Sequence, residues 1–152
     1  MKKKVIVVDL DGTLYNSTQR SHHIQAKDWE GFHAASINDP PNQDVIDLIK
    51  LISWNGSQRL IFMGVTGRNE RYREITMKWL LKHHVPLDEL HMRPDDNYES
   101  DIEIKTKLLS DALQAHDMGI EDVWFALEDR DRVVDHFRSI GIPTYQVRQG
   151  TY

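Results

Sequence analysis

The stretch VIVVDLDGTLYNS, residues 5–17, decides how the rest of the sequence is interpreted. Residues 5–8 form a continuous run of β-branched apolar side chains, which predicts a strand covered on both faces. The run leads directly into Asp9 and Asp11, and then into a Gly-Thr pair. Two carboxylates one residue apart at the end of a buried strand indicate either a turn that faces water or a site that holds positive charge.

The composition is that of an ordinary globular domain. The chain has 152 residues, 39% of them hydrophobic and 28% charged, which predicts a single domain over residues 1–152. A formal net charge of −5 argues against broad, non-specific binding of nucleic acid, but allows a local arginine cluster around one phosphate. The absence of cysteine excludes disulfides and thiolate sites. The apolar runs are far below the ~18 residues of a membrane span, and MKKK precedes only a short one, so we expect a cytoplasmic protein.

Hydrophobic patterns along the chain alternate between those of strands and those of helices. This alternation predicts an α/β fold in which a mainly parallel sheet is flanked by helices on both faces. Besides residues 5–8, strands are predicted over residues 60–65, 90–92, 123–127 and 144–147. Helices are predicted over residues 45–52, ended by Asn55-Gly56, and over residues 72–80, before Val85-Pro86. A third helix is predicted from the capping box Ser100-x-x-Glu103 to Met118-Gly119, and a fourth over residues 133–140, ended by Gly141.

Residues 15–41 are predicted to form a small cap or lid. They are polar and irregular in pattern, and a connection of this length in a compact domain is often functional. A cap this short leaves the site open to the end of a nucleic-acid strand or to a nucleotide, and we expect Arg20 to be exposed in it. Basic and aromatic side chains of the lid can contact phosphate and stack on bases, unless Trp29 and Phe32 pack the lid onto the sheet; these side chains are Arg20, His22, His23, Lys27, Trp29, Phe32 and His33.

Polar residues follow three of the predicted strands. Asp9 and Asp11 follow the first, the Thr66-Gly67-Arg68 segment follows the second, and the Glu128-Asp129 pair follows the fourth. Because the carboxyl ends of parallel strands meet at one edge of a sheet, where ligands bind, we expect these side chains to converge.

The expected chemistry of this edge follows from its charges. Two close carboxylates repel each other unless they share a proton or bind a hard cation such as Mg²⁺. Asp129 can add an oxygen ligand, Thr66 can donate a hydrogen bond, and Arg68 and Lys105 can supply positive charge. A metal ion and cationic donors around carboxylates suit the transfer of a phosphoryl group, and a carboxylate can itself attack phosphorus.

Each of these features has a simpler interpretation when it is taken alone. Asp-Gly and Thr-Gly sequences are common in turns. An acid such as Asp101 is favoured in the first turn of any helix, and Lys105 alone resembles a solvated helix lysine. Glu128 and Asp129 alone can cap the helix that follows them. The combination, in order and at strand ends, favours an active site.

The same motifs resemble those of the haloacid dehalogenase superfamily. DLDGTLYNS resembles its first motif, VTGR at residues 65–68 its second, Lys105 its third, and LED at residues 127–129 its acidic fourth. The order and spacing fit over essentially the whole chain. The resemblance implies a Rossmann-like haloacid dehalogenase fold with a small cap insertion.

A more specific resemblance is to the 3'-phosphatase domain of phage T4-type polynucleotide kinase-phosphatases. It is carried by Asp9-x-Asp11 with Arg20, by TGR, by Asp101-x-x-x-Lys105 and by EDRDRVVDHFRSIGIPTYQVRQGTY at residues 128–152. The resemblance implies an aspartyl-phosphate mechanism with Asp9 as nucleophile and Asp11 as general acid-base. It further implies that Thr66 and Lys105 are catalytic residues that hold phosphoryl oxygens, and that substrate is bound by Arg20, Thr66, Gly67 and Arg68. Asp101, which would orient Lys105 or Arg68, and Glu128 would be supporting residues. The ligands of Mg²⁺ would be Asp9, Asp129 and the backbone carbonyl of Asp11.

Two departures from this pattern bear on the substrate. The fourth motif reads Glu-Asp where close relatives usually have Asp-Asp, although Asp129 keeps the ligand position. No G-x-x-x-x-G-K-[ST] loop occurs, so the chain is expected to be the phosphatase part alone, with a separate kinase or ligase as a possible partner. Three functions follow: a Mg²⁺-dependent phosphatase that removes 3'-phosphates from nucleic-acid ends or nucleotides, a 5'(3')-deoxyribonucleotidase, or a non-catalytic domain that binds phosphorylated ends.

Overall fold

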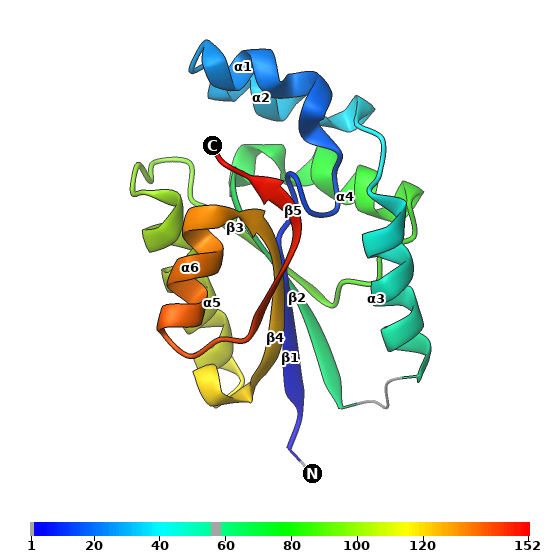
Figure 1. Ribbon diagram of the computed structural model, residues 1–152, viewed down its shortest axis with the longest axis vertical. Coiled ribbons are helices and arrows are strands. Elements are labelled where there is room, and N and C mark those ends of the chain that lie inside the picture. The colour runs from blue at the N-terminus through cyan, green and yellow to red at the C-terminus, as the bar shows by residue number, and fades with distance from the viewer. Residues whose placement is uncertain (1, 56–58) are drawn as a thin grey trace.

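A five-stranded parallel sheet forms the centre of the protein, with the strand order β3-β2-β1-β4-β5. The computed structural model describes residues 2–55 and 59–152 (Figure 1). The central strand β1 pairs with β2 on one side and with β4 on the other, so Asp9 lies at the middle of the carboxyl edge. The strands are β1 (Lys4–Val8), β2 (Leu60–Asn69), β3 (Glu89–Arg93), β4 (Val123–Arg130) and β5 (Thr144–Gly150).

Helices cover both faces of the sheet, which confirms the predicted α/β fold. Alternate residues of a strand point to opposite faces, so β1 contributes Val5 and Val7 to one core and Ile6 and Val8 to the other. One face packs against α5 and α6, and the other packs against α3 and α4 (Figure 1). These helices are α3 (Gln43–Asn55), α4 (Arg73–Lys82), α5 (Asp101–Ala115) and α6 (Asp131–Ser139).

Several predicted helix boundaries are confirmed. Ser100 and Glu103 form the capping box that begins α5. Gly141 follows the end of α6 with a φ of +92°, a conformation that glycine adopts without strain. Asn55 is the last residue of α3, whereas its predicted partner in the stop signal, Gly56, lies outside the described residues.

The lid differs from the irregular loop that the sequence predicted. It contains four short helices: η1 (Ser17–Arg20), α1 (Ser21–Gln25), α2 (Trp29–Ala34) and η2 (Ala35–Asn38). The Asn16 and Asp28 side chains accept hydrogen bonds from the backbone N–H groups of Thr18 and Gly31, which stabilises the starts of η1 and α2. Helices this short show no hydrophobic periodicity. The lid lies over the carboxyl edge of the sheet (Figure 1).

Three strands extend further than their apolar runs predicted. β2 reaches Asn69, β4 reaches Arg130 and β5 reaches Gly150, because the β2–β3 and β4–β5 pairings continue past register shifts at residues 66–69 and 128–130. The motif residues Thr66 and Asp129 therefore lie within strands and not in the loops after them. The short turns η3 (Glu70–Tyr72) and η4 (Ile120–Asp122) complete the elements. Within residues 2–55 and 59–152, the structure contains no helix with the length and hydropathy of a membrane span.

Candidate active site

Asp9 is buried at the carboxyl end of β1, and each of its carboxylate oxygens has a donor. Lys105 Nζ donates to Oδ1 at 2.8 Å and Thr13 Oγ1 donates to Oδ2 at 2.8 Å. The backbone N–H of Asp9 donates to Leu127 O at 3.1 Å, which fixes the strand end. The chain then turns at Gly12, whose φ is +83°. A Cβ atom on Gly12 would lie 2.1 Å from Asp129 Oδ2, so the turn requires glycine.

Lys105 reaches this site from α5 and is itself buried. Its Nζ lies 2.8 Å from both Asp9 Oδ1 and Glu128 Oε2, and 3.5 Å from Asp101. Burial alone would lower the pKa of Lys105, but the adjacent Asp9, Glu128 and Asp101 carboxylates raise it well above its usual value. The other Glu128 oxygen accepts the N–H groups of Asp129 and Arg130. Glu128 thus holds both the lysine and the strand end.

Three buried carboxylates form a possible cation site. Ligand atoms of Asp9, Glu128 and Asp129 lie within 4.8 Å of one another. Burial and the Glu128 charge raise the pKa of Asp9 to about 7, and burial and the Asp9 charge raise the pKa of Asp129 to about 6. The positive charge of Lys105 therefore does not fully offset the negative charge of the three carboxylates. An all-oxygen donor set with excess negative charge fits Mg²⁺.

The Asp11 side chain points away from this cluster, toward two arginines. Its Oδ1 accepts from Arg20 Nη2 at 2.5 Å and from Arg68 Nη2 at 2.6 Å, and Arg68 Nε lies 3.3 Å from Oδ2. Burial would raise the pKa of Asp11, but the two guanidinium groups outweigh it and hold that pKa well below its usual range. The neighbouring aspartates thus have opposite pKa shifts.

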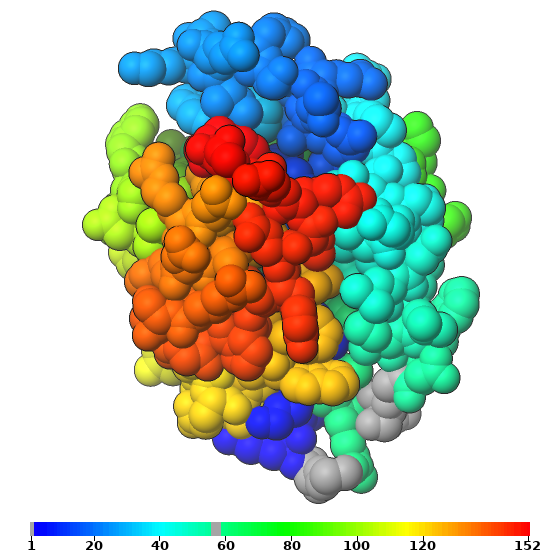
Figure 2. Space-filling model, viewed as in Figure 1, coloured from blue at the N-terminus to red at the C-terminus, as the bar shows by residue number. Residues whose placement is uncertain are grey.

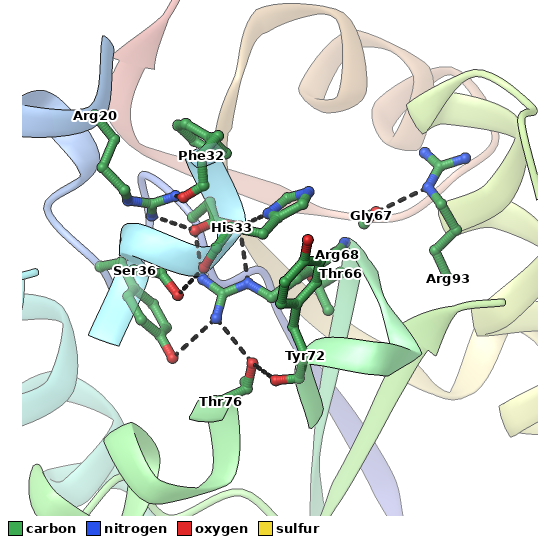
Figure 3. Close-up of polar contacts among 12 residues, drawn as sticks. Arg20, Phe32, His33, Ser36, Thr66, Gly67, Arg68, Tyr72, Thr76 and Arg93 are labelled. Atoms are coloured by element: carbon green, nitrogen blue, oxygen red, sulfur yellow. Dashed lines mark hydrogen bonds and ion pairs between the residues drawn. The ribbon is translucent and has the colours of Figure 1, made fainter. Parts of the chain in front are cut away.

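Arg20 is buried, which corrects the expectation that it is exposed in the lid. Its Nε donates to Asp39 Oδ2 at 2.8 Å. Its Nη1 donates to the carbonyl of Phe32 at 2.7 Å (Figure 3). The guanidinium lies 3.9 Å from the centre of the Phe32 ring. Arg20 lies near the start of the lid and contacts both the end of the lid and Asp11, so it stabilises the folded lid from within. The same contacts place Phe32 in the packed part of the lid.

Arg68 is fixed by the floor of the site. Its Nη1 donates to Thr76 Oγ1 at 2.8 Å and lies 3.3 Å from Tyr15 Oη (Figure 3). Its backbone N–H donates to Thr66 Oγ1. The Gly67 carbonyl accepts from a further arginine, Arg93. The TGR motif therefore lies at the predicted edge with its arginine aimed at Asp11.

Asp101 contacts three cations, and Lys105, one of the two alternative partners that the sequence predicted, is among them. Its carboxylate lies 2.9 Å from Arg130, 3.4 Å from Arg93 and 3.5 Å from Lys105, whereas Arg68 is held by other groups. A Cβ atom on Gly67 would lie 2.0 Å from Asp101 Oδ1, so glycine allows α5 to approach β2 closely.

These groups surround a cavity of about 500 Å³. Of the sequence-predicted site residues, Asp9, Asp11, Thr66, Gly67, Arg68, Asp101, Lys105 and Asp129 line it, whereas Arg20 and Glu128 support them from behind. Trp29, Tyr72, Tyr98 and Tyr152 add aromatic surface. The last residues of the sequence lie just below the lid on one face of the molecule (Figure 2).

Sequence reasoning missed several residues of this site. Thr13 and Arg93 come after predicted strands, at residues 5–8 and 90–92. The convergence of strand ends at the carboxyl edge, which identified Asp9, therefore applies to them as well. Tyr152 donates its hydroxyl to Asp129 Oδ2 at 2.6 Å, and Asp39 pairs with Arg20. Neither contact has a local sequence signal, because each depends on how distant segments pack.

Comparison with solved structures first defines the class. A haloacid dehalogenase-like hydrolase from Streptococcus pneumoniae matches 95% of this chain and 84% of its own, with 17% identity and a TM-score of 0.69. At this identity the likeness shows the fold alone, which is haloacid dehalogenase-like.

The chain belongs to the family of polynucleotide kinase PNKP phosphatase domains, whose model matches residues 3–152. A chain of the Pnkp1/Rnl/Hen1 complex is 29% identical, with a TM-score of 0.79 over 99% of this chain and 48% of that chain. A structure of the Pnkp1/Rnl/Hen1 RNA repair complex gives 28% identity and a TM-score of 0.75, over 99% and 44%. This chain therefore spans about half the length of those relatives. The predicted resemblance is confirmed, and the protein is a phosphatase domain of this type.

Proposed function

We propose that this protein is a Mg²⁺-dependent phosphomonoesterase that removes 3'-phosphates from nucleic-acid ends or nucleotides through an aspartyl-phosphate. The observation that carries the proposal is the environment of Asp9, a buried carboxylate at the floor of an open cavity with Lys105 and Thr13 on its two oxygens. Such a carboxylate is held in one orientation and faces the space where a phosphate can enter.

The proposed reaction has two steps. An Asp9 oxygen attacks phosphorus, the bond from phosphorus to the leaving oxygen breaks, and Asp11 donates a proton to that oxygen. Asp11 then takes a proton from water, whose oxygen attacks the aspartyl-phosphate and releases inorganic phosphate and Asp9. Lys105 and Thr66 hold phosphoryl oxygens during both steps and offset their charge.

The low pKa of Asp11 indicates how the arginines affect the proposed reaction. While both guanidinium groups bind Asp11, its carboxylate is a weak base and does not keep a proton. We infer that phosphoryl oxygens take over part of the contacts of Arg68, which lines the cavity. That exchange raises the pKa of Asp11 when substrate is bound, and makes proton transfer at its Oδ atoms possible.

Mg²⁺ is proposed to bind to Asp9, Asp129 and the backbone carbonyl of Asp11, with Glu128 behind them. When bound, the ion offsets the charge of the carboxylates and of the phosphoryl group. The raised pKa values of Asp9 and Asp129 support this assignment, because a cation beside them favours their ionised forms.

The cavity supports a substrate larger than inorganic phosphate. Trp29, Tyr72 and Tyr98 lie around the phosphate-binding floor and offer ring faces to a nucleobase. In this proposal residues 1–152 form one cytoplasmic domain with residues 15–41 as its cap, and a separate kinase or ligase is a candidate partner. The named complexes among the relatives, one of them an RNA repair complex, support action on nucleic-acid ends.

The test compares phosphate release from a 3'-phosphorylated oligonucleotide with release from 3'- and 5'-mononucleotides, with and without Mg²⁺. Asp9→Asn should abolish release from each of them, whereas Asp111→Asn, an exposed aspartate of α5, should leave it unchanged. A strong preference for mononucleotides would support the deoxyribonucleotidase alternative and reject action on strand ends. A wild type that binds the oligonucleotide and hydrolyses nothing would be a binding domain.

A further inference from the structure

Tyr152 lines the cavity and contacts Asp129, but the proposed reaction gives its hydroxyl no role. β5 brings this tyrosine to the site, because β5 pairs in parallel with β4 and Gly150 lies opposite Arg130 at the end of the pairing. The last residues of the sequence then lie just below the lid (Figure 2). The Tyr152 hydroxyl donates to Asp129 Oδ2 at 2.6 Å, the length of a strong hydrogen bond to a carboxylate.

Two glycines make room for this hydrogen bond. A Cβ atom on Gly12 would lie 2.1 Å from Asp129 Oδ2 and 2.7 Å from the Tyr152 hydroxyl oxygen. A Cβ atom on Gly150 would lie 2.7 Å from the same Asp129 oxygen. The turn after β1 and the end of β5 therefore both place bare backbone against the bonded pair. Such close packing leaves the carboxylate and the hydroxyl little freedom to separate.

The ring of Tyr152 is held by a contact of its own. The Arg130 guanidinium lies 4.6 Å from the centre of the ring, within the range of a cation–π interaction. Asp101 fixes that guanidinium at 2.9 Å. Because the ring and the hydroxyl have different partners, replacing the tyrosine by phenylalanine removes the hydrogen bond and keeps the ring contact.

Asp129 differs from the other two carboxylates of the cluster in having a neutral donor. Lys105 lies 2.8 Å from both Asp9 and Glu128. Asp129 instead accepts from the uncharged hydroxyl of Tyr152. A hydroxyl orients a carboxylate without offsetting its charge, so the attraction of Asp129 for a cation is preserved. An ionised carboxylate has about four lone-pair sites, and one hydrogen bond leaves the others for an ion.

We propose that Tyr152 is a positioning residue for Mg²⁺: its hydroxyl holds the Asp129 carboxylate in the orientation that binds the ion. This inference rests on the metal site of the proposed function and adds an outer contact to it. Carboxylates that bind metal ions are commonly held by such hydrogen bonds, and the affinity for the metal depends on them. Tyr152 acts on the reaction only through Asp129, so we expect it to change the Mg²⁺ requirement and not the rate at saturating Mg²⁺.

The test titrates the metal-free protein with Mg²⁺ in a calorimeter and compares the wild type with Tyr152→Phe. The variant should raise the Kd of Mg²⁺ roughly 10- to 100-fold. Phosphate release by the variant should require a correspondingly higher Mg²⁺ concentration and reach a kcat close to that of the wild type. Tyr145→Phe, which removes the hydroxyl of an exposed tyrosine of β5, should change neither quantity. Thermal unfolding without Mg²⁺ measures any effect of each change on the fold itself.

The outcomes separate the role of Tyr152 from the proposed function. Equal Mg²⁺ affinity in Tyr152→Phe and the wild type overturns the role of Tyr152, and a lowered Tm of that variant without Mg²⁺ would then assign the hydroxyl to packing. Tighter binding by Tyr152→Phe shows that the hydroxyl competes with the ion for Asp129, and also overturns the inference.

Two further outcomes concern the wild type. If it binds Mg²⁺ more tightly than Tyr152→Phe but hydrolyses no phosphorylated nucleotide or oligonucleotide, the proposed function fails and the role of Tyr152 stands. If the wild type binds no Mg²⁺, both the inference and the proposed metal site are rejected.

Discussion

Asp9 and Asp11 are separated by one residue, yet their surroundings give them opposite pKa shifts. Asp9 lies among carboxylates with one lysine, whereas Asp11 lies between two guanidinium groups. Their side chains leave the strand end in different directions, one toward the floor and one toward the lid. The pair therefore lies between an acidic part and a basic part of the site. This arrangement suits a ligand that needs both a bound cation and hydrogen-bond donors.

Arg20 is the residue on which this arrangement depends most. Arg20→Ala should lower the free energy of unfolding by about 3–5 kcal/mol, because it leaves the buried Asp39 carboxylate without its partner. Urea unfolding measures the effect. Gln19→Ala, at an exposed position of the same short helix, should stay within about 0.5 kcal/mol of the wild type. An Arg20→Ala protein of unchanged stability would show that the lid packs independently of this arginine.

At the scale of elements, the sequence predicted the strands and long helices well and the connections poorly. Buried apolar runs and helical periodicity identified the cores of β1, β4 and α5. Strand ends were missed because β2 and β4 continue pairing past register shifts, which no residue pattern marks. The lid helices were missed because five or six residues are too few for a periodic pattern.

The candidate site shows the same division. Residues that directly follow apolar runs, such as Asp9 and Asp129, were identified because parallel strands bring their carboxyl ends together. Contacts made across the fold, such as Tyr152 to Asp129 or Arg20 to Asp39, were not. The burial of Arg20 was the largest error, because polar sequence around it gives no sign of the carboxylates that surround it.

The capping box of α5 supports the placement of Lys105. Ser100→Ala removes the hydrogen bond from Glu103 N–H to Ser100 Oγ and should destabilise the protein by about 1 kcal/mol. Thermal or urea unfolding measures this change. Ser110→Ala, at an exposed site of the same helix, should be neutral or stabilising by up to about 0.5 kcal/mol. Equal effects of the two changes would argue against a stabilising cap.

For the whole molecule, the acidic cluster predicts that Mg²⁺ stabilises the fold. A ligand at 100 times its dissociation constant adds about 2.7 kcal/mol of stability, which corresponds to a rise in Tm of roughly 5–10 °C for a chain of this length. Calorimetry with and without Mg²⁺ measures the rise. Asp129→Asn should abolish it and Asp111→Asn should keep it. A rise that survives Asp129→Asn would place the ion elsewhere.

The position of Tyr152 has a practical consequence for protein production. Its hydroxyl donates to Asp129, and its ring lies 4.6 Å from the Arg130 guanidinium at the edge of the cavity. Any affinity tag or fused reporter joined after residue 152 would emerge at the entrance to the active site. The amino-terminal end of β1 lies at the opposite end of the sheet (Figure 1). Fusions intended for activity assays, surface immobilisation or crystallisation should therefore be attached there.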